Sequence, residues 1–241
     1  MKVKGTGLMA KVMIVSYNVK GLNHPAKRKK VLTQLKGFKC DIAMLQETHL
    51  TEEETKKLKR DWVGQVFGSS FKKRRGAAIL IKQGVHFVAE EVRSDKSGRY
   101  VMVVGTLGGE EVTLVNIYAP PEESPAIFKE VADLITLEAK GMLIWGGDMN
   151  TVMDEKVDRD PEGKERGGRT KMLNKITGEL GLVEVWRFRH PREREYTFYS
   201  NAKQSQSRID LIYIPKQHLH RVLESKIDPI TISDHAPVFL E

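Results

Sequence analysis

Long apolar runs and paired cysteines are both missing from this sequence. No stretch of about 18 apolar residues occurs in the 241-residue chain, which excludes a membrane-spanning helix. The single cysteine, Cys40, excludes an internal disulfide and fits a reducing compartment. No group of cysteines and histidines has the spacing of a zinc site. With 40% hydrophobic and 30% charged residues, the composition is that of an ordinary soluble globular protein.

A Ser/Gly-rich linker and internal repeats are absent too, so we expect residues 1–241 to form one domain. Short apolar runs typical of strands cover residues 11–19, 41–48, 76–82, 99–107, 111–120, 141–150, 195–200 and 207–215. Helical patterning covers residues 25–37, 51–62, 123–141 and 170–181, and residues 153–168 read as a charged loop. Because some strands follow strands directly, the order favours two packed sheets with helices outside.

Positive charge is concentrated in four short clusters on a chain whose net charge is +8. The clusters are residues 27–30, 72–75, 164–171 and 187–194. One such cluster alone is usually a solvated surface. Four of them on a basic chain indicate a polyanionic partner, and nucleic acid is the first expectation.

Polar side chains stand at the ends of several apolar runs. A further polar pair precedes the short apolar run at residues 238–240. Any one of them could be ordinary turn chemistry. Their repetition favours a site at the rim of a sheet, where strands hold functional groups rigidly. The residues concerned are Asn18, Glu47, Tyr118, Asp148, Asn150, Asp210, Asp234 and His235.

The stretches SYNVKGL, LQETH, NIYAP, GGDMN, SRIDLIY and SDHAPV, in this order, resemble the motif series of the exonuclease/endonuclease/phosphatase superfamily. Within it, LQETHLT, GAAILI, VNIYAP and YTFYS are most similar to the nicking endonuclease domain of LINE-type (non-LTR) retrotransposons. The resemblance implies an α/β fold, a four-layer sandwich of two mixed β-sheets packed face to face with helices outside.

Three positions depart from relatives in the superfamily. AP endonucleases generally carry Asp where this chain has Lys20, and Trp where it has Ser207, so the abasic-sugar pocket of a repair enzyme is not expected. Many relatives carry a phosphate-binding Asn where this chain has Pro121. Since proline has no backbone N–H donor, that phosphate contact is missing or supplied elsewhere.

By resemblance, Glu47 binds the metal with Asn18 beside it, and Asp234 lies near the metal or the leaving group. Oxygen ligands of this kind suit Mg²⁺, for which Mn²⁺ can substitute. The other six histidines have no partner motif and are expected to be surface or core residues. They are His24, His49, His86, His190, His218 and His220.

The resemblance also assigns the chemistry of phosphodiester hydrolysis. Asp148 and Asn150 orient the attacking water, with Asp148 as the base, and Tyr118 hydrogen-bonds the phosphate. Asp210 pairs with His235, so that the imidazole keeps its proton.

Residues 199–207 lie between two strand-like runs and are rich in small polar side chains, as in a hairpin that could enter a minor groove. The alternative is an unremarkable turn. Including the positions suggested by resemblance, the expected DNA contacts are Thr197, Ser207, Arg159, Asn201 and Lys203.

The expected activity is a metal-dependent nick in one strand of double-stranded DNA, which leaves 3′-hydroxyl and 5′-phosphate ends and primes reverse transcription. By resemblance, the domain is monomeric and begins a longer polyprotein that contains a reverse transcriptase, is made in the cytoplasm and acts in the nucleus. A phosphatase for small molecules or lipids, and an inactive DNA-binding module, are the alternatives.

Overall fold

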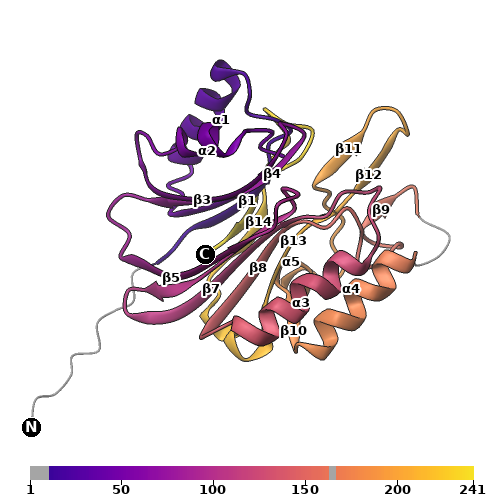
Figure 1. Cartoon of the computed structure of the whole chain (residues 1–241). Coiled ribbons are helices and arrows are strands. Elements are labelled where there is room, and N and C mark those ends of the chain that lie inside the picture. Colours follow the sequence, from indigo (N-terminus) through magenta and orange to yellow (C-terminus); the bar gives the residue numbers. More distant parts are fainter. Residues whose placement is uncertain (1–10, 163–166) are drawn as a thin grey trace, which may run out of the picture.

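The computed structural model describes residues 11–162 and 167–241 of the chain. Two large sheets dominate it (Figure 1). The helices are α1 (Pro25–Gly37), α2 (Glu52–Lys56), α3 (Ala126–Glu138), α4 (Gly168–Glu179), α5 (Val185–Arg189) and the 3-10 helix η1 (Lys216–Arg221). The strands are β1 (Ile14–Asn18), β2 (Ile42–Gln46), β3 (Val63–Phe71), β4 (Arg75–Lys82), β5 (Phe87–Ser94), β6 (Tyr100–Leu107), β7 (Glu110–Tyr118), β8 (Met142–Asp148), β9 (Arg159–Asp160), β10 (Leu182–Glu184), β11 (Phe198–Ser200), β12 (Ser205–Ser207), β13 (Asp210–Pro215), β14 (Ser225–Ile227) and β15 (Val238–Leu240).

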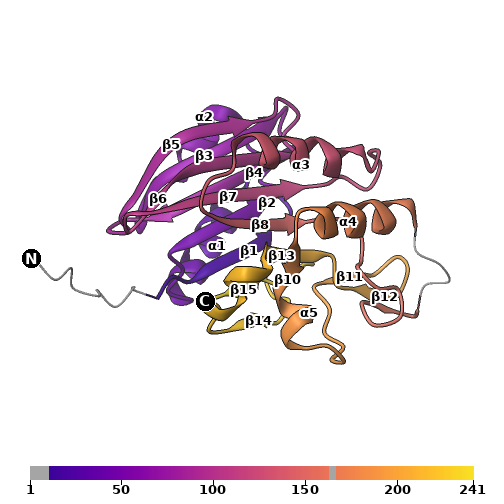
Figure 2. The same cartoon turned by 90° about the horizontal axis from the view of Figure 1, so that it is seen from below.

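Each large sheet has six strands and mixes parallel with antiparallel pairs. The first has the order β14-β15-β1-β2-β4-β3, with β1 and β2 parallel. The second has the order β10-β13-β8-β7-β6-β5, with β7 and β8 parallel. A third, small sheet, β11-β12-β9, projects from one end of the molecule (Figures 1 and 2).

Three apolar clusters separate four layers of structure. Ile42 and Met44 of β2 point into the cluster between the two large sheets, whereas Ala43 and Leu45 point into the cluster beneath α1. The third cluster lies between the second sheet and helices α3 and α4. Because successive strand residues face opposite sides, a strand covered on both faces carries apolar residues on both, as β2 does from Ile42 to Leu45. The expected four-layer sandwich is confirmed.

A buried polar contact crosses between the two large sheets. Gln46 Nε2 of β2 donates to Asn116 Oδ1 of β7 at 2.7 Å. Asn116 Nδ2 in turn donates to the backbone carbonyls of Leu45 and Ala78, each at 2.9 Å. The amide therefore fixes the register of one sheet against the other.

The starts of α1 and α2 follow their sequence signals closely, but α2 ends at Lys56 and does not extend to the expected residue 62. Helix α1 covers the expected residues, with Pro25 in its first turn and Val31, Leu32 and Leu35 on its buried face. The capping box is present in α2, where Thr51 and Glu54 bond each other's backbone N–H. Within residues 11–162 and 167–241, no helix is long and apolar enough to cross a membrane.

Several elements differ from expectation. Strands β3 and β5 were not expected, because they are sheet edges whose half-exposed faces carry polar and charged residues. The loop expected at residues 153–168 contains strand β9 and the fully buried Asp158, which bonds Arg208 Nε at 2.8 Å. Residues 163–166 of that loop lie outside the described residues.

Candidate active site

The polar strand ends meet at one edge of the two large sheets. Strands β1 and β2 are parallel neighbours; Asn18 is the last residue of β1, and Glu47 directly follows β2. Strands β7 and β8 are also parallel neighbours, and they end at Tyr118 and Asp148. Asp210 begins β13 directly opposite Asp148, because these two strands are antiparallel. The edge thus gathers side chains from five strands, as the sequence predicted.

A buried cluster of Asp148, Asp210 and His235 forms the centre of this edge. Their ligand atoms all lie within 4.8 Å of one another. His235 Nδ1 and Asp210 Oδ2 are 2.8 Å apart, which is the expected pair. Asp210 Oδ1 is buried and has no hydrogen-bond partner among the described residues.

Burial and mutual charge shift the pKa values in this cluster. Burial and the neighbouring charge of Asp210 raise the pKa of Asp148 to about 7. Burial alone would lower the pKa of His235, but the charge and the hydrogen bond of Asp210 outweigh it and raise that pKa to about 9. Near neutral pH, His235 is therefore charged and Asp148 lies close to its titration midpoint.

Two asparagines orient the Asp148 carboxylate. Asn150 donates its backbone N–H to Oδ1 at 2.9 Å and its side-chain amide to Oδ2 at 3.0 Å. Asn18 Nδ2 donates to Oδ2 at 2.8 Å. The carboxylate is thereby fixed in one orientation, as a water-positioning base requires.

The orientation of the Asn18 amide is set by groups whose roles are unambiguous. Its nitrogen also donates to Glu47 Oε1 at 2.9 Å, and its oxygen accepts from the backbone N–H of Lys20 at 3.0 Å. A carboxylate here only accepts and a backbone N–H only donates, so the amide has one consistent orientation. Asn18 therefore orients Glu47 and Asp148 through its nitrogen, and its expected place beside the metal stays a prediction.

Glu47 is the carboxylate best placed to bind a divalent cation. Burial would raise its pKa, but hydrogen bonds from His49 and Asn18 outweigh burial, so the pKa lies below its usual value and the group is ionised. Its side chain is 20% exposed. The buried cluster is a poorer cation site, since it already holds the positive charge of His235. An ionised, accessible oxygen ligand fits Mg²⁺, which needs few protein ligands.

Tyr118 stays a neutral phenol beside this carboxylate. Burial raises its pKa well above the usual value, and the charges of Glu47 and Asp148 raise it further. A neutral hydroxyl keeps its proton and can donate it in a hydrogen bond to a phosphate oxygen, which is the expected role of Tyr118.

His49 was expected to have no functional partner, and the structure corrects this. Its Nε2 atom lies 3.2 Å from Glu47 Oε2. The sequence signal was present, because His49 follows Glu47 by two residues at the end of a strand. It was missed because no second motif pointed to it.

Asp234 has a partner that the sequence did not reveal. Lys20 Nζ lies 2.6 Å from Asp234 Oδ2. Lys20, Glu47, His49 and Asn150 all have left-handed backbone conformations, with φ between 45° and 53°. Such conformations are costly for residues other than glycine and often cluster at functional sites.

Thr197 is fully buried, so direct contact with DNA does not fit its position. Its hydroxyl accepts hydrogen bonds from the backbone N–H groups of Ile209 at 3.0 Å and Asp210 at 3.1 Å. Thr197 therefore holds the start of β13 and, through it, the Asp210 carboxylate.

The other expected DNA contacts lie on the small sheet. Asn201 and Lys203 are exposed at the tip of the predicted β11–β12 hairpin. Ser207 is half-buried in β12 and pairs with Arg159 of β9, whose side chain is 3.2 Å from Glu155.

The base of the hairpin touches the catalytic cluster. The ring of Phe198 in β11 lies 4.7 Å from the ring of His235, centroid to centroid, and Tyr199 N donates to Asp234 O at 3.3 Å. Phe198 was not expected to have a role, because an aromatic residue in a short strand reads as core.

Some residues of the basic clusters are used inside the protein. Arg75 forms ion pairs with Glu122 and Glu123, and Arg187 Nη2 lies 2.6 Å from Asp158 Oδ1. Residues 164–166 of the third cluster lie outside the described residues.

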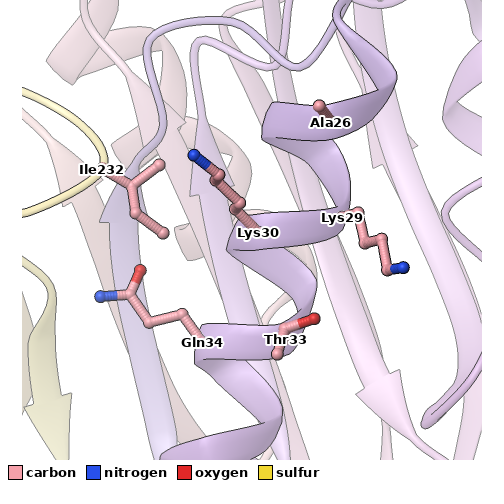
Figure 3. Close-up of a pocket in the computed structure, with 6 residues that line it drawn as sticks. All are labelled: Ala26, Lys29, Lys30, Thr33, Gln34 and Ile232. Atoms are coloured by element: carbon pink, nitrogen blue, oxygen red, sulfur yellow. The ribbon is translucent and has the colours of Figure 1, made fainter.

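The cluster on α1 borders a shallow hollow (Figure 3). Lys30 and Gln34 extend from the helix toward Ile232, and Gln34 Nε2 donates to Thr231 Oγ1 at 2.9 Å. None of the expected catalytic residues lines this hollow.

Comparison with solved structures agrees with the fold. The chain is similar to an AP endonuclease from Leishmania major, with a TM-score of 0.77 and 18% identity over 95% of this chain and 86% of that one. It is also similar to the endonuclease domain of TRAS1, a telomere-specific non-LTR retrotransposon, with a TM-score of 0.72 and 20% identity over 96% of this chain and 98% of that one.

Sequence comparison finds related proteins of two kinds. The chain is 29% identical over 233 residues to an uncharacterized 149 kDa protein of transposon TX1 from Xenopus laevis, covering 94% of this chain and 18% of that protein. It is 25% identical over 258 residues to an exodeoxyribonuclease of Bacillus subtilis, covering 94% of this chain and 98% of that enzyme. Residues 15–235 match the endonuclease/exonuclease/phosphatase family, so this protein is a member of that family.

Proposed function

We propose that this protein is a Mg²⁺-dependent DNA endonuclease that nicks one strand and leaves 3′-hydroxyl and 5′-phosphate ends. The observation that carries the proposal is the buried Asp148–Asp210–His235 cluster, flanked by the ionised Glu47. The net charge of +8 supports a polyanionic substrate. Similarity to the TX1 transposon protein and to the TRAS1 endonuclease domain supports DNA as that polyanion.

The residues divide the chemistry of hydrolysis between them. Asp148, held by Asn18 and Asn150, accepts a proton from the water that attacks phosphorus. The bond from phosphorus to the 3′ oxygen breaks and that oxygen takes a proton from solvent water, while charged His235 and neutral Tyr118 donate hydrogen bonds to phosphate oxygens. A Mg²⁺ ion bound at Glu47 would add Lewis-acid stabilisation of the developing negative charge.

We further propose that the nick primes reverse transcription of a LINE-type retrotransposon. The chain spans 18% of the length of the TX1 protein, which leaves ample room for other domains in such a relative. In this proposal, the described fold acts as a monomeric N-terminal domain ahead of a reverse transcriptase, in a protein that is made in the cytoplasm and cuts DNA in the nucleus.

Incubation with supercoiled plasmid, with and without EDTA, tests the activity. A metal-dependent endonuclease converts the plasmid to open circles only when a divalent cation is present, and a ligase should then reseal the nicks without end repair. A phosphatase would leave the plasmid intact, and an inactive DNA-binding module would bind it without cutting. Open circles that form in EDTA, or ends that resist ligation, would contradict the proposal.

Substitution of the proposed metal ligand tests the cofactor. Glu47→Ala should raise the Mg²⁺ or Mn²⁺ concentration needed for half-maximal nicking, because Mg²⁺ relies on very few protein ligands. A variant that titrates like the parent, or turnover supported by zinc alone, would exclude this assignment.

A further inference from the structure

Lys20 is held in place at every polar atom. Its backbone N–H donates to Asn18 Oδ1 at 3.0 Å, and its carbonyl accepts from Lys27 Nζ at 2.8 Å. Its ammonium group lies 2.6 Å from Asp234 Oδ2. The backbone φ of 45° is left-handed, and Gly21 continues the bend with φ 87°.

These contacts set the Lys20–Asp234 ion pair apart from an ordinary surface ion pair. A free surface lysine loses side-chain entropy when it pairs, which leaves the median exposed pair worth little. Here the Lys20 side chain is 60% exposed, but its backbone is fixed by Asn18 and Lys27, so the side chain extends from one defined position. The side chain of Asp234 is only 27% exposed, and that residue lies between Ser233 and the catalytic His235.

Burial lowers the pKa of Lys27, and the charges of Asp234 and Glu47 oppose that shift, so both carboxylates lie within electrostatic reach of one lysine. Without Lys20, the site would present two accessible carboxylates and could take two divalent cations. With Lys20 present, its ammonium group already forms an ion pair with Asp234.

We propose that the Lys20 ammonium takes the place of a second divalent cation at Asp234, so that the site binds one metal ion, at Glu47. This inference rests on the proposed function for its catalytic meaning. A tethered ammonium has the advantage over Mg²⁺ because it is always present at high local concentration, whereas Mg²⁺ must shed part of a tightly held water shell to bind. Only one of its three N–H donors is used by Asp234, so the others can face a phosphate oxygen.

Counting bound Mn²⁺ by electron paramagnetic resonance, in the whole chain without DNA, tests the proposal. The parent protein should bind one Mn²⁺ and Lys20→Ala should bind two. Lys20→Ala combined with Asp234→Asn should return to one. Lys129→Ala is the matched control, because it frees Asp133 from a lysine in the same way but far along the chain, on α3. It should still bind one.

Two Mn²⁺ ions in the parent, one in Lys20→Ala, or an equal gain in Lys129→Ala would each overturn the inference. Thermal unfolding checks that the variants fold, with midpoints expected within about 4 °C of the parent. In nicking assays, Lys20→Ala should change the Mg²⁺ dependence from hyperbolic to sigmoidal. A parent protein that nicks nothing would refute the proposed function, while the Mn²⁺ counts would still decide the role of Lys20.

Discussion

One carboxylate, Asp210, acts on both of the residues that carry the proposed chemistry. It keeps His235 charged by a hydrogen bond of 2.8 Å, and its charge helps to keep the pKa of Asp148 near 7. We therefore expect Asp148→Asn and His235→Ala to lower the nicking rate by about 100-fold or more. Each removes a transition-state interaction, so DNA affinity should stay within a few-fold of the parent.

Nicking rates and DNA affinities of both variants, measured in one buffer, check this expectation. Gln217→Ala, exposed in η1, serves as the control and should keep the parental rate and affinity. Equal losses of affinity and rate would contradict the roles given to Asp148 and His235.

The pH dependence of nicking should be bell-shaped. The rate should fall as pH drops below about 7, because protonated Asp148 cannot accept a proton from water. It should also fall as pH rises above about 9, because His235 then loses the charge that stabilises the phosphate. A pH–rate profile under single-turnover conditions measures both limbs.

Asp210→Asn should move both limbs to lower pH, since the charge of Asp210 raises both pKa values. Titration of His235 by nuclear magnetic resonance gives a readout that does not depend on the residual rate. An unchanged pKa of His235 in this variant would show that Asp210 does not control it.

At the scale of single residues, the sequence predicts the contacts of residues that lie in short recognisable motifs. It misses most contacts between segments that the fold brings together. The Asp210–His235 pair was predicted from two short motifs and is present. The contact of Phe198 depends on the base of a hairpin, which no spacing reveals, whereas that of His49 had a local spacing but no second motif to support it. Thr197 was predicted to touch DNA, yet its burial could be seen only once β13 was placed beside it.

Among the elements, we propose the β11–β12 hairpin as the sensor of DNA shape, because the proposed catalytic groups would contact only phosphate and water. We expect a preference for nicks at T–A steps flanked by A/T runs, which differ most from other DNA in flexibility and groove width. Replacing residues 201–204 with a two-residue Asn-Gly turn should flatten the distribution of nick sites.

Sequencing of nick positions on one plasmid compares the two proteins. Hydrolysis of generic DNA should stay within about tenfold of the parent, since the catalytic groups read no sequence. An unchanged pattern of sites would show that the tip does not read DNA, and attention would move to Arg159 and β9.

The elements themselves were predictable where both faces of a strand or one face of a helix are buried. Helix α1 and strands β2 and β8 have that character. In the edge strand β5 only Phe87 is buried, and the strand carries Glu90, Glu91 and Arg93, so its sequence reads as a polar loop. Pairing with β6, which is a long-range contact, makes it a strand.

At the scale of the whole molecule, one amide connects the two large sheets. Asn116→Ala would leave the Leu45 and Ala78 carbonyls without this buried donor, while Gln46 Nε2 keeps Ser16 and Met44 as acceptors. We expect a loss of about 2–4 kcal/mol in the free energy of unfolding. Urea denaturation measures it, with exposed Asn201→Ala as the control within about 0.5 kcal/mol. A loss below about 1 kcal/mol would contradict this role.

The contact between the rings of Phe198 and His235 links the proposed sensor of DNA shape to the proposed site of cutting. A DNA segment that fits the hairpin poorly would displace Phe198, and with it the imidazole of His235, without weakening the phosphate contacts made elsewhere in the site. Selectivity of this kind acts on turnover and not on residence time. It would persist at saturating DNA, where a preference based on affinity alone disappears, and unsuitable sites would be visited, held and released uncut.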